Sequence, residues 1–215
     1  MNLDFNTLDL GDITLDDGAL INVAGENNGD ISVNTRNLTL KENSIFNAGI
    51  TSPNSTSETQ GGDIIVNASA SISLESGSIF RNNVNANSAG NAGDIIVTAN
   101  NLSLADNSDI STATQGNGNA GNINLDIADS IVLNRMSRIR SQILSEGIGN
   151  GGNIQINSDL LDLDNNSLLI ANIIGIGDGG NIQIESNTIS LNNNSFFLAD
   201  VRGQGIGGDL SLIHI

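Results

Sequence analysis

The sequence predicts an all-β fold, a single-stranded parallel β-helix in which each coil of the chain stacks on the coil before it. Two observations predict it. A short phrase returns every 28 to 33 residues, and between its copies apolar residues alternate with polar ones at period two. A repeat of this length is typical of stacked supersecondary units, and period-two alternation is typical of β-strands. We therefore expect seven to eight coils, with three short strands in each.

The returning phrase is a Gly-Asp or Gly-Asn step followed by an apolar residue, which we call the Gly-Asx phrase. Its copies are separated by 33, 31, 28, 31, 28 and 28 residues. They are Gly29-Asp30-Ile31, Gly62-Asp63-Ile64, Gly93-Asp94-Ile95, Gly121-Asn122-Ile123, Gly152-Asn153-Ile154, Gly180-Asn181-Ile182 and Gly208-Asp209-Leu210. Residues 1–28 are expected to form one more coil, with its first strand at Leu3 to Phe5 and with Gly11-Asp12 just before its middle strand.

Three alternating runs follow each phrase, for example Ile95 to Val97, Leu102 to Leu104, and Ile110 to Thr112. Before the third run most coils place Asn or Gly, as at Asn107, where a tight corner would need a left-handed backbone. Met136 occupies this place in one coil and departs from the pattern.

Like residues recur at the inward positions of successive coils and predict a thin, aliphatic interior. With coils about 4.8 Å apart, the stack would be roughly 35 Å long. One expected ladder is Leu15, Leu40, Leu74, Leu104, Leu133, Leu163 and Leu191, and another is Ile21, Phe46, Phe80, Ile110, Ile139, Leu169 and Phe197.

Composition limits the partners that the chain could have. Its 24 acidic and seven basic residues give a formal net charge of -17, which argues against nucleic acid because phosphate binding needs many cations. No run of about 20 apolar residues is present, so no membrane span is expected. The chain has no cysteine, which removes disulfides and thiol chemistry.

The unbroken repeat predicts one continuous β-helix over residues 1–209, with coils starting near residues 1, 29, 62, 93, 121, 152, 180 and 208. Residues 210–215 have two interpretations. Leu-Ser-Leu-Ile-His-Ile is what a transposase end sequence used in preparing sequencing libraries would encode, and we expect this origin. Alternatively the segment is a true strand of the eighth coil, because Gly208-Asp209-Leu210 keeps the repeat in phase.

The whole repeat, with the phrase Gly90-Asn91-Ala92-Gly93-Asp94-Ile95, resembles the filamentous-haemagglutinin-like exoproteins of two-partner secretion, especially the cyanobacterial type. The resemblance covers residues 1–209. It implies a right-handed coil, export through an outer-membrane transporter partner, and an extracellular location at the cell surface as an adhesin that contacts surface carbohydrate or neighbouring cells. The family's amino-terminal secretion domain is not present in this sequence, so export is expected only if the sequence is part of a longer chain.

Three arginines gather within six residues, at Arg135, Arg138 and Arg140. Arg138 and Arg140 flank the inward Ile139 and should point outward. They could form a contact for an anion or an acidic glycan. A solvated face, or neutralisation of neighbouring acids, is the favoured explanation.

The longest insertion runs from Gly49 to Gln60 and contains the only proline of the chain. Loops on a rigid solenoid are frequent places for binding residues, which makes Asn54, Ser55 and Thr56 candidates for ligand contact. A flexible spacer is the simpler alternative.

Carboxylates at Asp16, Asp17, Asp162 and Asp164 could bind Ca²⁺ weakly, since calcium takes oxygen ligands. Solvated corner charges explain them as well, and no cofactor is expected.

The favoured function is a structural, adhesive rod without catalytic activity. The alternative is a pectate-lyase-like β-helix that binds or cleaves polysaccharide, because fold alone does not exclude catalysis. The lack of Trp and Tyr, with one Lys and one His, makes a sugar-cleaving groove hard to build.

Overall fold

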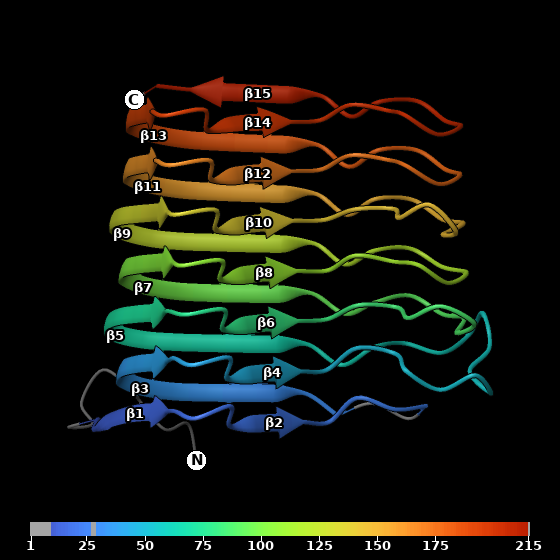
Figure 1. Ribbon diagram of the computed structural model, residues 1–215, viewed down its shortest axis with the longest axis horizontal. Helices are drawn as coiled ribbons and strands as arrows, with labels where there is room; N and C mark the ends of the chain where they lie inside the picture. The colour runs from blue at the N-terminus through green and yellow to red at the C-terminus, as the bar shows by residue number, and fades with distance from the viewer. Residues whose placement is uncertain (1–9, 27–28, 215) are drawn as a thin grey trace, which may run out of the picture.

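The computed structural model describes residues 10–26 and 29–214 of the 215-residue chain. These residues form an all-β parallel β-helix of about seven turns, as predicted, with two sheets of parallel strands (Figure 1). The expected strand at Leu3 to Phe5 lies outside the described residues.

Long strands stack in one sheet and short strands in the other, and the segments that return the chain to the next coil extend to one side (Figure 1). The eight-stranded sheet contains β1 (Asp12–Leu15), β3 (Ile31–Leu40), β5 (Ile64–Leu74), β7 (Ile95–Ala105), β9 (Ile123–Asn134), β11 (Ile154–Leu163), β13 (Ile182–Leu191) and β15 (Leu210–Ile213). The seven-stranded sheet contains β2 (Leu20–Asn22), β4 (Ile45–Asn47), β6 (Ile79–Arg81), β8 (Asp109–Ser111), β10 (Arg138–Arg140), β12 (Leu168–Ile170) and β14 (Phe196–Leu198).

The prediction of three short strands per coil is wrong in one respect, because the first two runs join into a single long strand. In β7, Ile95 and Val97 face the interior, and so do Leu102 and Leu104 further along. The pairing of β7 with β9 shifts register between Ala99 and Asn101. Such an irregularity bends a strand, so both halves can bury their side chains in the same interior.

The corner between each long strand and the next short strand has one geometry throughout. Two consecutive residues have positive φ, as in a type I′ turn, for example Asp106 (57°) and Asn107 (64°). In the five inner corners the residue that follows is a buried serine, and at Ser108 its hydroxyl donates to the carbonyl of Ala105 at 2.7 Å. Met136 has φ 63° and does not break the pattern, so its side chain is accommodated in the left-handed region.

The interior contains the two predicted ladders, and strand pairing places their members opposite one another from coil to coil. Phe46 and Phe80 stack with ring centroids 5.1 Å apart and an interplanar angle of 7°. Leu40 and Leu104 are fully buried, whereas Leu191 in the last described coils is 43% exposed. In the inner coils each apolar side chain of a ladder is therefore covered by its equivalents on either side, whereas Ile21 and Leu191 near the ends are partly exposed.

The Gly-Asx phrase ends each return segment, by which we mean the chain between a short strand and the next long strand. A Cβ atom on Gly121 would lie 1.9 Å from the carbonyl oxygen of Gly93 in the previous coil, so only glycine allows this approach. The residue after the glycine accepts a hydrogen bond from the next coil: Oδ1 of Asn122 accepts the backbone N–H of Asn153 at 2.9 Å. The same bond joins the equivalent pairs from Asp30 to Asp209.

Strand β15 pairs in parallel with β13, with Leu210 opposite Ile182. Residues 210–213 thus lie in the stack as a further strand. The origin of residues 210–215 from a library sequence stays a prediction.

Candidate ligand-binding surfaces

Arg135 lies at a corner and pairs with Asp106 in the preceding coil. Hydrogen bonding to this guanidinium holds the pKa of the Asp106 carboxyl below its usual range. Both side chains are about half exposed, and they line a shallow hollow with Met136 and Asn165. Arg135 is therefore already occupied by a neighbouring acid.

Arg138 and Arg140 point outward from β10, as expected, on either side of the buried Ile139. Both approach one carboxylate oxygen, Oδ2 of Asp109: Nη2 of Arg140 lies 2.7 Å from it and Nη2 of Arg138 lies 3.9 Å away. The Asp109 side chain is only 3% exposed, so the two arginines cover its charge. This geometry favours neutralisation of a neighbouring acid over an open anion site.

The insertion between Gly49 and Gln60 folds on itself through turns. Ser55 donates from its hydroxyl to the carbonyl of Ser52 at 2.7 Å, and its Oγ accepts the backbone N–H of Ala89 in the next coil at 2.9 Å. Asn54 and Thr56 are exposed. The insertion follows β4, three strands from β10 in the short-strand sheet, so the structure does not bring these residues together with the arginines.

Two of the carboxylates considered for calcium, Asp16 and Asp164, have other partners in the structure. Asp16 pairs with Lys41 at 2.9 Å, and this hydrogen bond lowers the pKa of the Asp16 carboxyl. Asp164 accepts hydrogen bonds from the backbone of Asn165 and from the side chain of Asn193. Among residues 10–26 and 29–214, acidic and histidine side chains do not gather in groups of three or more suited to a metal ion.

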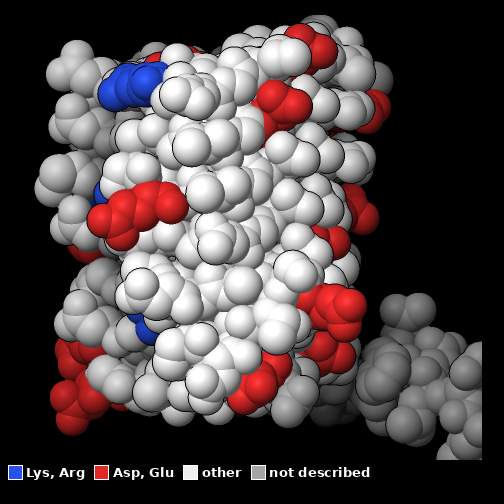
Figure 2. All heavy atoms as spheres, turned by 90° about the vertical axis from the view of Figure 1, so that its right-hand side faces the viewer, with Lys and Arg blue, Asp and Glu red and all other residues white. Residues whose placement is uncertain are grey.

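Basic side chains do not gather on the face formed by the ends of the return segments. Figure 2 shows scattered acidic residues there, isolated basic ones, and a broad uncharged area between them. The exposed isoleucines Ile148, Ile174 and Ile176 belong to these segments. Within the described ranges, no helix is long and apolar enough to cross a membrane.

A groove that sequence reasoning did not identify lies on the outer face of the long-strand sheet. One hollow of about 540 Å³ and another of about 350 Å³ share Thr98 and Asp126 among their lining residues. One row of side chains, which we call the polar row, crosses five successive long strands and lies in these hollows. It consists of Asn34, Asn67, Thr98, Asp126 and Asn157, which strand pairing places opposite one another.

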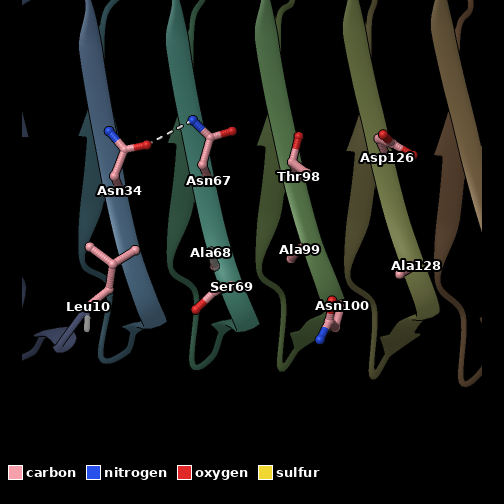
Figure 3. A pocket seen from close by; sticks show the side chains of 10 residues that line it. All are labelled: Leu10, Asn34, Asn67, Ala68, Ser69, Thr98, Ala99, Asn100, Asp126 and Ala128. Carbon is pink, nitrogen blue, oxygen red and sulfur yellow. Dashed lines mark hydrogen bonds between the residues drawn. The ribbon is translucent and has the colours of Figure 1, made fainter. Parts of the chain in front are cut away.

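Figure 3 shows four members of the polar row side by side on neighbouring strands, with Ala68, Ser69, Ala99 and Asn100 among the residues below them. Nδ2 of Asn67 donates to Oδ1 of Asn34 at 3.1 Å, and Nδ2 of Asn157 donates to Oδ1 of Asp126 at 3.1 Å. Ala68 and Ala99 also line the groove, but both are buried and belong to the interior core. The exposed residues of the lining are thus mainly polar.

Sequence reasoning missed the groove because its members look like ordinary outward positions of alternating strands. The signal that could have revealed it is the repeated Asn or Thr three residues after the first apolar residue of the long strand, at Asn34, Asn67, Thr98 and Asn157. That row becomes a groove only because the long strands bend just beyond it, which period-two alternation does not indicate.

The chain matches no family model, no curated protein and no solved structure. Its class is therefore defined by the fold alone, a parallel β-helix repeat protein.

Proposed function

We propose that this chain is a structural and adhesive rod segment of a secreted, cell-surface protein, without catalytic activity. The observation that supports this proposal is that polar side chains bond one coil to the next. The Asp and Asn of the Gly-Asx phrases accept backbone N–H groups from the next coil, and Arg135, Arg138 and Arg140 pair with acids. These charged and amide groups are thus engaged in holding the stack.

Export through an outer-membrane transporter belongs to this proposal through the resemblance of the repeat to two-partner exoproteins. A rigid stack with an acidic surface suits that role, since net charge keeps an extended protein soluble. The coils repeat the same contacts, so such a rod can be lengthened without a new core.

The proposal is tested by coating beads with the chain and measuring their retention under flow on cells and on immobilised polysaccharides. We expect retention above that of beads coated with an unrelated acidic protein. Equal retention of both bead types would contradict an adhesive role.

A viscosity assay on neutral and acidic polysaccharides tests the absence of catalysis. We expect viscosity to stay constant over hours with the chain present. A steady fall in viscosity that scales with protein concentration would contradict the proposal and favour a polysaccharide-cleaving β-helix.

A further inference from the structure

Part of the polar lining of the groove on the long-strand sheet is hydrogen-bonded within the polar row, since Asn67 donates to Asn34 and Asn157 donates to Asp126. Another part of the lining has no such bond. In the groove, the side chains of Ser69, Thr98 and Asn100 are exposed and make no hydrogen bond with any described residue. These three side chains are available to a ligand.

We propose that this groove binds a neutral, extended polysaccharide along the stacking axis. The inference deepens the proposed adhesive function and rests on it. Adjacent members of the polar row lie one strand apart, about 4.8 Å, because the coils stack as parallel strands. This interval is close to the length of one sugar unit in an extended glycan chain, so each unit would meet one member of the row.

The chemistry of the lining favours hydroxyl-rich ligands. Amide side chains such as Asn67 and Asn100 offer both donors and acceptors, and the Thr98 hydroxyl does the same. Sugar hydroxyls also both donate and accept hydrogen bonds. The half-buried Ile65 and Ile96 beside the polar row provide apolar area for the C–H faces of the sugar rings.

Charge in the groove disfavours acidic ligands. The lining residues include one carboxylate, Asp126, and no Lys or Arg. A uronic acid polymer would meet the Asp126 carboxylate with no cation in the lining to neutralise it. Neutral polysaccharide is therefore preferred over acidic polysaccharide at this place, whereas an acidic polymer would have to use the arginines of β10.

Affinity at this groove is expected to be low for a short oligosaccharide, because its lining lacks aromatic rings that stack on sugars. Length should compensate for this, since one polymer would contact several coils at once. Long chains should therefore bind well above oligosaccharides of the same sugar.

Native gel electrophoresis in gels that contain a soluble polysaccharide tests the inference. The probes are dextran, galactomannan and xyloglucan as neutral polymers, and polygalacturonate and alginate as acidic ones. Thr98→Arg places a long cation in the middle of the groove. Ser103→Arg is the matched control, since it adds the same side chain to the outer face of the same strand beyond the bend. Circular dichroism and thermal melting check that both variants fold.

We expect at least one neutral polymer to retard the natural chain and Ser103→Arg equally, and Thr98→Arg to bind it about tenfold more weakly, which corresponds to about 1.4 kcal/mol. Equal retardation of all three proteins would show that the polymer does not bind in this groove. Preferential retardation by acidic polymers would overturn the ligand class. If no polymer retards the chain while coated beads still adhere to cells, this inference fails and the adhesive function stands. If the beads also fail to adhere, both fail.

Discussion

The two places where the chain changes direction within a coil differ in how far they tolerate variation. Between the long and the short strand the corner always has two left-handed residues followed by a serine or alanine, from Asp17-Gly18 to Asn193-Asn194. The return segments vary, and the one between β4 and β5 carries the longest insertion. A corner inside a packed stack is fixed by the coils above and below, whereas a return segment is fixed only where the Gly-Asx phrase rejoins the stack.

This difference shows which parts of each coil tolerate changes in sequence and length. The variable part of each return segment lies at the surface, where changes in length cost little. Its end is held by a glycine that contacts the previous coil and by a side chain that bonds to the next. Substitutions at the points where the chain joins the stack should therefore cost more stability than changes in the surface part of a return segment.

Gly121→Ala should cause the largest loss of stability, about 3 kcal/mol, because its Cβ would lie 1.9 Å from the carbonyl oxygen of Gly93. Chemical denaturation followed by circular dichroism measures the effect. Gly207→Ala is the control, since its nearest neighbour would lie 3.6 Å away, an ordinary contact. Similar losses in both variants would contradict a special role for the phrase.

Asn153→Ala should destabilise the chain by about 1 kcal/mol, because the backbone N–H of Asn181 loses the Oδ1 acceptor that lies 2.8 Å away. Asn153→Asp keeps that oxygen, as other coils do with Asp30, Asp63 and Asp94, and should unfold close to the natural midpoint. If the two variants lose the same stability, the side-chain ladder does not contribute as we describe.

Met136→Asn should raise stability by about 0.5 to 1 kcal/mol, because asparagine adopts φ near 63° at lower cost than methionine. Met136 is 52% exposed, so little packing is lost. Met136→Leu keeps the strained backbone with a similar apolar side chain and should give no gain in the same denaturation experiment. A gain from leucine would attribute the effect to packing instead.

Deleting residues 53–57 shortens one coil from 33 residues to 28, the length of three other coils, and should change stability by less than about 0.5 kcal/mol. Any loss should arise from the bond between the Ser55 hydroxyl and the backbone N–H of Ala89. Ser55→Ala should then reproduce it. A large loss from the deletion alone would show that the return segment is constrained along its whole length.

The sequence predicted the coil and its inward ladders correctly because both follow from periodicity. Leu104 and Ile110 are buried at the positions that alternation assigns to them. The corners were predicted for the same reason, since Asn and Gly mark left-handed backbone. Met136 departs from the Asn or Gly pattern in sequence, but its backbone has the same left-handed conformation as the other corners.

What the sequence did not reveal depends on contacts between coils. The joining of two runs into β7 follows from an irregular pairing with β9, which no single coil encodes. Asp94 and Asn122 of the Gly-Asx phrases each accept a hydrogen bond from the backbone of the next coil. A contact between coils of this kind is not visible in the sequence of one repeat. The groove likewise depends on the bend in the long strands, which the alternation of residues does not reveal.

Hydrogen exchange tests most directly the claim that the Gly-Asx phrases hold the coils together through their side chains. The backbone amides of Asp94, Asn122, Asn153 and Asn181 should exchange as slowly as amides inside β7 and β9, although they lie outside the strands. The amides of residues 54–58 should exchange fast. If the four amides exchange as fast as those of residues 54–58, the Gly-Asx phrases do not join the coils.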